Sequence, residues 1–147
     1  MRVVIQRVRS ASVLSEGQEA GKIGMGLLLY IGVVDGDTEA DMKYIADKIP
    51  YLRIFPDEND KMNLSVLDVG GEILAVSQFT LAADCSHGRR PSFTDAMAPE
   101  PAEKMYDDLV ALWRSRGIKV ETGVFQTSML VSSENWGPVT FILESKK

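Results

Sequence analysis

Apolar and polar residues alternate at the start of the chain. Residues 2–9 place Val3 and Ile5 on one face of a predicted strand. Arg7 falls on the same face. Because an unpaired buried charge is unfavourable, we expect the guanidinium of Arg7 to have a partner on a neighbouring segment.

Further strands are predicted by the segments that follow. Residues 11–15 and 18–23 indicate a hairpin. Residues 27–34 are almost continuously apolar, which is typical of a central strand covered on both faces. A second apolar run, residues 73–76, follows the turn signal Gly70-Gly71 and predicts another buried strand.

Two segments carry the three-and-four spacing of an amphipathic helix. The first covers residues 42–49 and is expected to end near Ile49, because Pro50 cannot continue it regularly. The second has its apolar stripe in residues 102–113, and Gly117 is the expected stop signal.

The remaining segments complete the expected fold. A short strand at 52–55 and a polar loop at 56–63 lie between the two apolar runs, and three more strands are predicted at 118–122, 129–134 and 139–144. The total is about eight strands and two helices, with strands before, between and after the helices. This order predicts a single α+β domain spanning residues 1–147, with a mixed or mostly antiparallel sheet.

The composition of the chain excludes several classes of protein. The chain has 147 residues, of which 45% are hydrophobic and 25% charged, and its net charge is −5. An acidic chain is a poor candidate for general, salt-driven nucleic-acid binding, although Arg89 and Arg90 form a local basic patch. The single cysteine, Cys85, is compatible with a reducing cytosol. We see no signal peptide and no apolar run near the ~20 residues of a membrane span, so we expect a cytoplasmic protein without a membrane partner.

Candidate chemistry gathers at the end of the strand at 73–76. Ser77, Gln78, Phe79 and Thr80 offer two hydroxyls, an amide and a ring. If the strand persists, Ser77 and Phe79 share one face, and Gln78 and Thr80 share the other. Such groups at the end of a rigid strand are well placed to orient a ligand, and they are also suited to satisfying nearby backbone groups.

The sequence offers no candidate for the usual general base. His87 is the only histidine, and it lies beside Arg89 and Arg90 in a predicted loop. One histidine and one cysteine do not make a zinc site, and nothing supports a Ser-His-Asp triad. We therefore expect no metal and no cofactor. The chemistry would come from backbone N–H groups, hydroxyls and positioning, or from a group of the substrate.

Gly137-Pro138 forms a predicted turn before the last strand. Its role is either purely structural or that of a rigid backbone probe. A cis peptide bond here would point two carbonyl groups in the same direction.

Taken together, these motifs resemble the D-aminoacyl-tRNA deacylase family of the common bacterial and eukaryotic type. The similarity covers essentially the whole chain. Its segments are residues 6–8, 52–55, 61–63, 77–81, 88–93, 120–125 and 137–140.

The resemblance implies a barrel-like, homodimeric protein with its active site at the subunit interface. It implies hydrolysis of the ester between a D-amino acid and the 3′-terminal adenosine of tRNA, with action on glycyl-tRNA, as translation quality control. Family members insert a cis Gly-Pro of one subunit into the pocket of the other, which excludes an L side chain by steric contact. Carried onto this chain, that motif is Gly137-Pro138. The same resemblance implies that Met129 lies in the substrate pocket, that Arg7 holds the Gly-Pro loop, and that Arg89 and Arg90 contact tRNA.

Thr80 matches a family residue once regarded as a nucleophile. A threonine without a base is a poor nucleophile. We therefore expect the backbone N–H groups of Phe79 and Thr80 to bind the oxyanion, while the 2′-hydroxyl of the terminal adenosine assists the attacking water. Ser77 and Gln78 would position the substrate.

The sequence differs from the usual family pattern at three places. Trp136 stands where family members commonly have Asp, residues 126–128 replace a segment rich in Gly and Ala, and residues 82–87 replace a loop with Thr, Arg and Lys.

Two other functions are alternatives to the deacylase. One is a non-catalytic nucleic-acid-binding module that uses Arg89 and Arg90. The other is a hydrolase of small esters with the same pocket.

Overall fold

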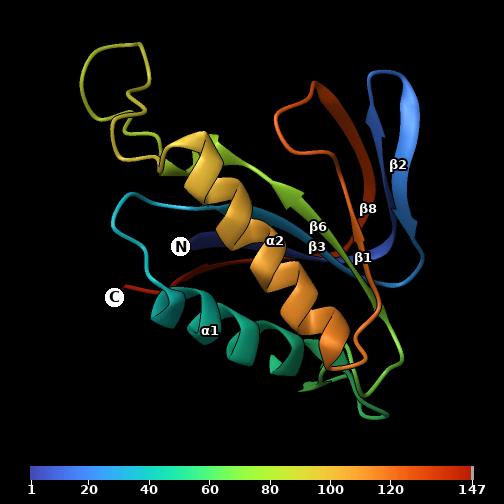
Figure 1. The fold of residues 1–147 in the computed structure, drawn as a ribbon. Helices are drawn as coiled ribbons and strands as arrows, with labels where there is room; N and C mark the ends of the chain where they lie inside the picture. The colour runs from blue at the N-terminus through green and yellow to red at the C-terminus, as the bar shows by residue number, and fades with distance from the viewer. Residues whose placement is uncertain (147) are drawn as a thin grey trace.

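The fold is an α+β arrangement in one domain, described here from a computed structural model that covers residues 1–146. Figure 1 shows two helices packed against a strongly curved sheet. The elements of this part of the chain are β1 (Arg2–Ser15), β2 (Gln18–Ile23), β3 (Gly26–Gly32), α1 (Glu39–Lys48), β4 (Phe55–Pro56), β5 (Met62–Leu64), β6 (Glu72–Ser77), α2 (Pro99–Ser115), β7 (Val120–Thr122) and β8 (Met129–Glu144).

Strand β1 organises the sheet. It pairs antiparallel with β3, β2 and β8, while β3, β6 and β7 run parallel to one another. The sheet is therefore mixed, as predicted. It curls until its end strands approach each other: a Cβ on Gly21 of β2 would lie 2.6 Å from the carbonyl oxygen of Thr122 in β7. This close approach makes the sheet a nearly closed barrel.

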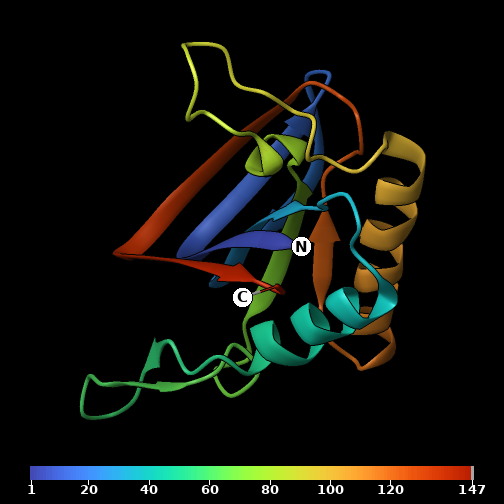
Figure 2. The same cartoon turned by 90° about the vertical axis from the view of Figure 1, so that its left-hand side faces the viewer.

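The main core lies between the sheet and the two helices (Figures 1 and 2). Trp113 of α2 is fully buried, and its indole N–H donates to the carbonyl of Ala46 in α1 at 3.1 Å. Helix α1 begins after Thr38, whose backbone N–H donates to the carboxylate of Asp41 at 2.8 Å. A smaller apolar cluster fills the inside of the curl. Both predicted helices are confirmed in position.

Long-range pairing joins segments that the sequence suggested were separate. The strand predicted at 2–9 and the first arm of the predicted hairpin, 11–15, form one strand, β1. The strands predicted at 129–134 and 139–144 form one strand, β8. Both β8 segments stay paired with β1, on either side of an irregularity. The turn signal at 135–138 therefore produces a bulge rather than a break.

The region between α1 and β6 also differs from the prediction. Residues Ile49–Tyr51 form a 3-10 turn with Pro50 in its first turn, and only Phe55 of the predicted strand at 52–55 belongs to a strand, β4. The predicted polar loop at 56–63 turns back into β5, because the carboxylate of Asp57 accepts hydrogen bonds from the backbone N–H groups of Asn59 and Lys61. The resulting hairpin projects from the body of the molecule (Figure 2).

Strand β6 does not persist through residue 80. It ends at Ser77, and residues Phe79–Ala82 form a 3-10 turn. The expected alternation of faces therefore stops at Ser77. The Gln78 amide instead donates to the Thr80 hydroxyl within the turn. Among the described residues, no helix has both the length and the apolar composition needed to cross a membrane.

Candidate active site

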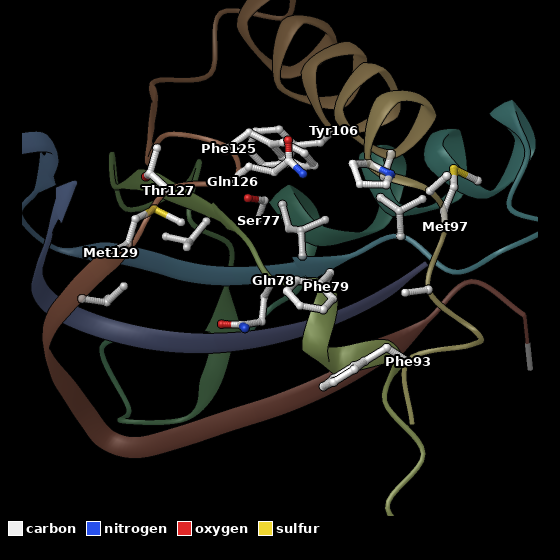
Figure 3. Close-up of a pocket in the computed structure, with 18 residues that line it drawn as sticks. Ser77, Gln78, Phe79, Phe93, Met97, Tyr106, Phe125, Gln126, Thr127 and Met129 are labelled. Carbon is white, nitrogen blue, oxygen red and sulfur yellow. The ribbon is translucent and has the colours of Figure 1, made fainter. Parts of the chain in front are cut away.

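A cavity of about 680 Å³ opens where β6 ends, beneath the N-terminal half of α2 (Figure 3). Its walls come from β3, β6, the 3-10 turn, the segment leading into α2, the first half of α2, the segment joining β7 to β8, and the start of β8. The lining residues are Ile31, Val33, Val76, Ser77, Gln78, Phe79, Phe93, Ala96, Met97, Ala98, Pro99, Ala102, Tyr106, Phe125, Gln126, Thr127, Met129 and Val131.

Backbone hydrogen bonds fix the end of β6 against its neighbours. The N–H of Gln78 donates to the carbonyl of Ile31 in β3 at 2.8 Å. The 3-10 turn then begins, and its first internal donor is the N–H of Leu81, which bonds to Gln78 at 3.3 Å. The N–H groups of Phe79 and Thr80 precede this donor, in the positions that a helical turn leaves without an internal partner. They are well suited to receive an oxyanion.

The lining of the cavity carries no Asp, Glu, His or Lys side chain. Its one phenol, Tyr106, is buried and donates to the carbonyl of Ala75 at 2.6 Å. Burial raises the pKa of Tyr106 well above its ordinary value, so this group stays protonated near neutral pH. The cavity therefore offers neutral donors and acceptors in an apolar enclosure.

Two exposed phenylalanines stand at the rim of the cavity. Phe79 and Phe93 have ring centroids 5.3 Å apart and planes tilted by 56°. Figure 3 shows them opposite Phe125 and Tyr106. Phe93 follows a projecting loop that is closed by two 2.8 Å backbone hydrogen bonds between Asp84 and Ser92.

The bulge in β8 consists of residues 136–139. Asn135 pairs with Val8 and Thr140 with Gln6, so four residues of β8 stand opposite Arg7 alone. Within the bulge the peptide bond from Gly137 to Pro138 is cis, and both residues are exposed.

Arg7 is the buried anchor of this bulge. Its Nε donates to the carbonyl of Trp136 at 3.1 Å, and its Nη1 donates to the carbonyl of Ile54 at 2.8 Å. Burial lowers the pKa of Arg7, Asp60 opposes that shift, and the nearby charge of Arg9 adds to it. An arginine nonetheless stays charged in a protein. The expectation that Arg7 points inward and finds a partner is confirmed.

Comparison with known protein families matches residues 4–144 to the family described as D-Tyr-tRNA(Tyr) deacylase. The chain belongs to this family. It is 56% identical, over 100% of its length and 99% of the relative, to a D-aminoacyl-tRNA deacylase of Halothermothrix orenii. It is also 56% identical, over 98% of its length and 99% of the relative, to a D-aminoacyl-tRNA deacylase of Pelobacter propionicus. The protein is therefore an enzyme, as the sequence predicted.

Solved structures share the fold of this deacylase family member. A protein described as c-Myc DNA Unwinding Element Binding Protein superposes with a TM-score of 0.94 at 38% identity, and the match covers 100% of both chains. A probable eukaryotic D-amino acid tRNA deacylase superposes with a TM-score of 0.85, covering 97% of this chain and 98% of the other. At 18% identity, that second match supports the fold alone.

The structure brings only part of the predicted site together. Ser77, Gln78, Phe79 and Met129 line the cavity, whereas Thr80 is exposed and lies outside the lining. The other predicted residues lie away from this cavity: Arg7, Gly137 and Pro138 at the bulge, and Arg89 and Arg90, both exposed, on the projecting loop.

Other lining residues were not expected from the sequence. Phe93, Tyr106 and Phe125 are three of the four aromatic residues of the lining, and Gln126 and Thr127 supply polar groups. Phe93 and Phe125 lie in segments that carry the family resemblance, but Tyr106 reads as an ordinary core position of a helix. Within residues 1–146, no cluster of three or more His, Cys, Asp or Glu side chains is arranged to hold a metal ion.

Proposed function

We propose that this enzyme hydrolyses the ester that joins a D-amino acid, or glycine, to the 3′-terminal adenosine of tRNA. The observation that carries the proposal is the cavity at the end of β6, which has no charged lining residue and adjoins the turn that follows Ser77. Within residues 1–146, the backbone N–H groups of Phe79 and Thr80 in that turn have no backbone partner. The position of the cavity in a D-aminoacyl-tRNA deacylase family member supports the substrate class.

The proposed reaction uses water and neutral donors. Water attacks the ester carbonyl carbon, and the developing oxyanion accepts hydrogen bonds from the N–H groups of Phe79 and Thr80. The ester C–O bond then breaks. The 3′ oxygen takes one proton of the water and leaves as a hydroxyl group, the amino acid leaves as the free carboxylate, and the second proton of the water is released to the solvent. Because the cavity lacks a basic side chain, the 2′-hydroxyl of the adenosine would assist the attacking water.

A second copy of the chain would complete the site. Gly137 and Pro138 are exposed and do not line the cavity of their own chain. On the outer face of β8, Leu130 and Ile142 are 65% and 67% exposed, on either side of the bulge. Large apolar side chains that are left exposed gain stability if a second copy covers them. We propose that two copies join through this face, so that the turn of one copy enters the cavity of the other.

That arrangement would provide selectivity by exclusion. The carbonyl groups of the turn hold the substrate's amino group, and an L side chain meets the turn itself. Glycine has no side chain and is therefore accepted. Met129, on the cavity wall, would contact the amino acid, while Arg89 and Arg90 would contact the tRNA backbone. Aminoacyl-tRNA as substrate also implies that the enzyme works in the cytoplasm.

The decisive experiment compares four substrates with one enzyme preparation. We expect hydrolysis of D-tyrosyl-tRNA and glycyl-tRNA, survival of L-tyrosyl-tRNA, and little action on free D-tyrosine ethyl ester. Ester loss is followed by acid precipitation of tRNA charged with a labelled amino acid for the first three and by chromatography for the fourth. Equal rates on the D and L forms would overturn the proposal. Equal efficiency on the free ester would indicate a small-molecule hydrolase.

The similarity to a protein described as a DNA-binding protein favours a second candidate, a nucleic-acid-binding module. Arg89 and Arg90 on their exposed loop would be its contacts. The net charge of −5 opposes it. Duplex DNA binding that falls steeply with salt, together with no loss of ester from any aminoacyl-tRNA, would support this candidate over the deacylase.

A further inference from the structure

The indole of Trp136 lies against two arginines of β1. The Cζ atom of Arg7 is 4.3 Å from the centroid of the ring, and the Cζ atom of Arg9 is 4.7 Å from it. Phe55 of β4 packs against the same ring, at 6.2 Å between centroids and a tilt of 59°. A guanidinium over an indole is attracted to the electrons of the ring, most strongly where water is partly excluded. Trp136 therefore links the bulge to two other strands.

This residue is also the first residue of the bulge. Its backbone carbonyl accepts the 3.1 Å hydrogen bond from Arg7, and Gly137 follows immediately. Between Asn135 and Thr140 the bulge has no pairing partner in β1. Its shape therefore depends on side-chain contacts. One of these is the bond from the N–H of Val139 to the side chain of Asn135, at 3.2 Å, and Trp136 supplies others.

The ring also holds two like charges near each other. Arg7 and Arg9 are two residues apart on β1, and both approach the indole. Arg7 is buried, whereas Arg9 is exposed. Without the ring, the side chain of Arg9 would be free to move into solvent and Arg7 would lose one of its faces of contact. The carbonyl of Trp136 would then be held by a less restrained donor.

We propose that Trp136 and Arg9 are positioning residues that hold the Gly137–Pro138 turn in the shape required for selection between D and L substrates. Neither residue touches the reacting atoms. This inference rests on the proposed function, because it specifies how the turn presented to a second copy is kept rigid. Trp136 and Arg9 would thus act together with Arg7 in anchoring the bulge.

The test measures kcat/KM for D-tyrosyl-tRNA and L-tyrosyl-tRNA. We expect Trp136→Ala to lower the D-to-L ratio by at least about 10-fold, because small displacements of a positioning element reduce discrimination strongly. Trp136→Phe keeps a ring in place and should recover most of the ratio. Arg9→Ala should lie between Trp136→Ala and the wild type.

A matched control comes from helix α1. There the ammonium group of Lys48 lies 5.5 Å from the ring centroid of Tyr44, away from the bulge and the cavity. Tyr44→Ala removes a cation–aromatic contact of the same kind and should leave the ratio unchanged. An equal drop in the ratio for Tyr44→Ala and Trp136→Ala would overturn the inference, since it would reflect general destabilisation.

A spectroscopic readout tests the contact independently of activity. The chain has two tryptophans, so incorporation of 5-fluorotryptophan gives two ¹⁹F resonances, and Trp136→Phe identifies one of them. Arg9→Ala should shift the Trp136 resonance and leave that of Trp113 in place. If the shift is absent and the D-to-L ratio of Arg9→Ala equals that of the wild type, the inference is wrong. Because Arg9 is exposed, this variant decides the matter even if Trp136→Ala does not fold.

Failure of the inference differs from failure of the proposed function. A wild-type enzyme that hydrolyses both forms equally would refute the function itself. A selective wild type with equally selective Trp136→Ala and Arg9→Ala variants would refute the inference alone.

Discussion

The two regions that we propose form the active site are built in opposite ways. The wall at the end of β6 has no charged side chain, and its useful groups are backbone donors of a short turn. The bulge of β8 presents an exposed glycine and proline. It is anchored by the buried guanidinium of Arg7, which donates to a carbonyl group of the bulge and to the carbonyl of Ile54. The β6 wall provides hydrogen-bond donors for the reaction, whereas the bulge provides a rigid surface that can exclude a substrate.

This difference suggests a division of labour. Neutral backbone donors can stabilise an oxyanion without needing a particular protonation state. A turn that selects by exclusion needs rigidity, which strong hydrogen bonds from a buried guanidinium provide. The chemistry should therefore tolerate the loss of a side chain at the β6 wall better than selection tolerates a change of shape at the bulge.

The largest effect is expected at the bulge. Gly137 has φ of +129°, and a Cβ there would lie 2.7 Å from Cγ2 of Val139 and 3.1 Å from Nη2 of Arg7. Gly137→Ala must therefore displace the turn or its anchor. We expect kcat/KM for D-tyrosyl-tRNA to fall by about 100-fold or more, as a misplaced positioning element can cause. Steady-state kinetics on folded protein, with folding checked by circular dichroism, measures this.

A mixing experiment sharpens the same prediction. Ala98→Trp fills the cavity from an exposed lining position and should also inactivate the enzyme. If the turn of one copy serves the cavity of another, a mixed dimer of the two variants regains one intact site. Random exchange should then restore about a quarter of wild-type activity, given a symmetric dimer. A mixture that stays inactive would place cavity and turn in the same chain and contradict the comparison.

The sequence was informative where local patterns decide the structure. Apolar runs correctly predicted β3 and β6. The alternation in residues 2–9 correctly predicted that Arg7 shares the buried face of its strand. The local pattern could not identify the partners of Arg7, because the carbonyl groups of Ile54 and Trp136 are 47 and 129 residues away. Only the family resemblance placed Arg7 at the Gly-Pro loop. For the same reason β8 was predicted as two strands, since only its pairing with β1 carries it across the bulge.

The cavity was only half predictable. Ser77, Gln78 and Phe79 stood out because polar residues ended an apolar strand. The opposite wall combines Tyr106 of α2 with Phe125 of a distant segment, and only tertiary packing brings these together. The turn after Ser77 was missed because it is stabilised by local bonds that a strand pattern does not reveal.

A smaller effect is expected at Thr80. Its side chain is exposed, lies outside the cavity lining, and accepts a hydrogen bond from the Gln78 amide. Thr80→Val keeps the backbone N–H and the shape but removes the hydroxyl. We expect kcat/KM to fall by no more than about 3-fold, the scale of losing one positioning contact. Rapid-quench measurement of the chemical step checks this. Complete loss in a folded protein that still binds substrate would make the hydroxyl a nucleophile.

The smallest effect on activity is expected at Tyr106, the one phenol of the cavity wall. Tyr106→Phe removes the donor to the carbonyl of Ala75, so it should lower the free energy of unfolding by about 1 kcal/mol at pH 7. Activity should stay within about 2-fold from pH 6 to 9, because a protonated phenol takes no part in proton transfer there.

The pH dependence of stability tests the same assignment. Burial raises the pKa of Tyr106 in the folded protein above the value of about 10 expected when it is unfolded. The folded state then holds this proton more tightly than the unfolded state. The free energy of unfolding of the wild type therefore exceeds that of Tyr106→Phe by its full amount below pH ~10, and this difference declines as the pH rises further. Urea unfolding of both proteins between pH 7 and 11 measures the difference. An inflection in the pH–rate profile that disappears in Tyr106→Phe would instead make the phenol an acid–base group, and the β6 wall would no longer be the neutral counterpart of the bulge.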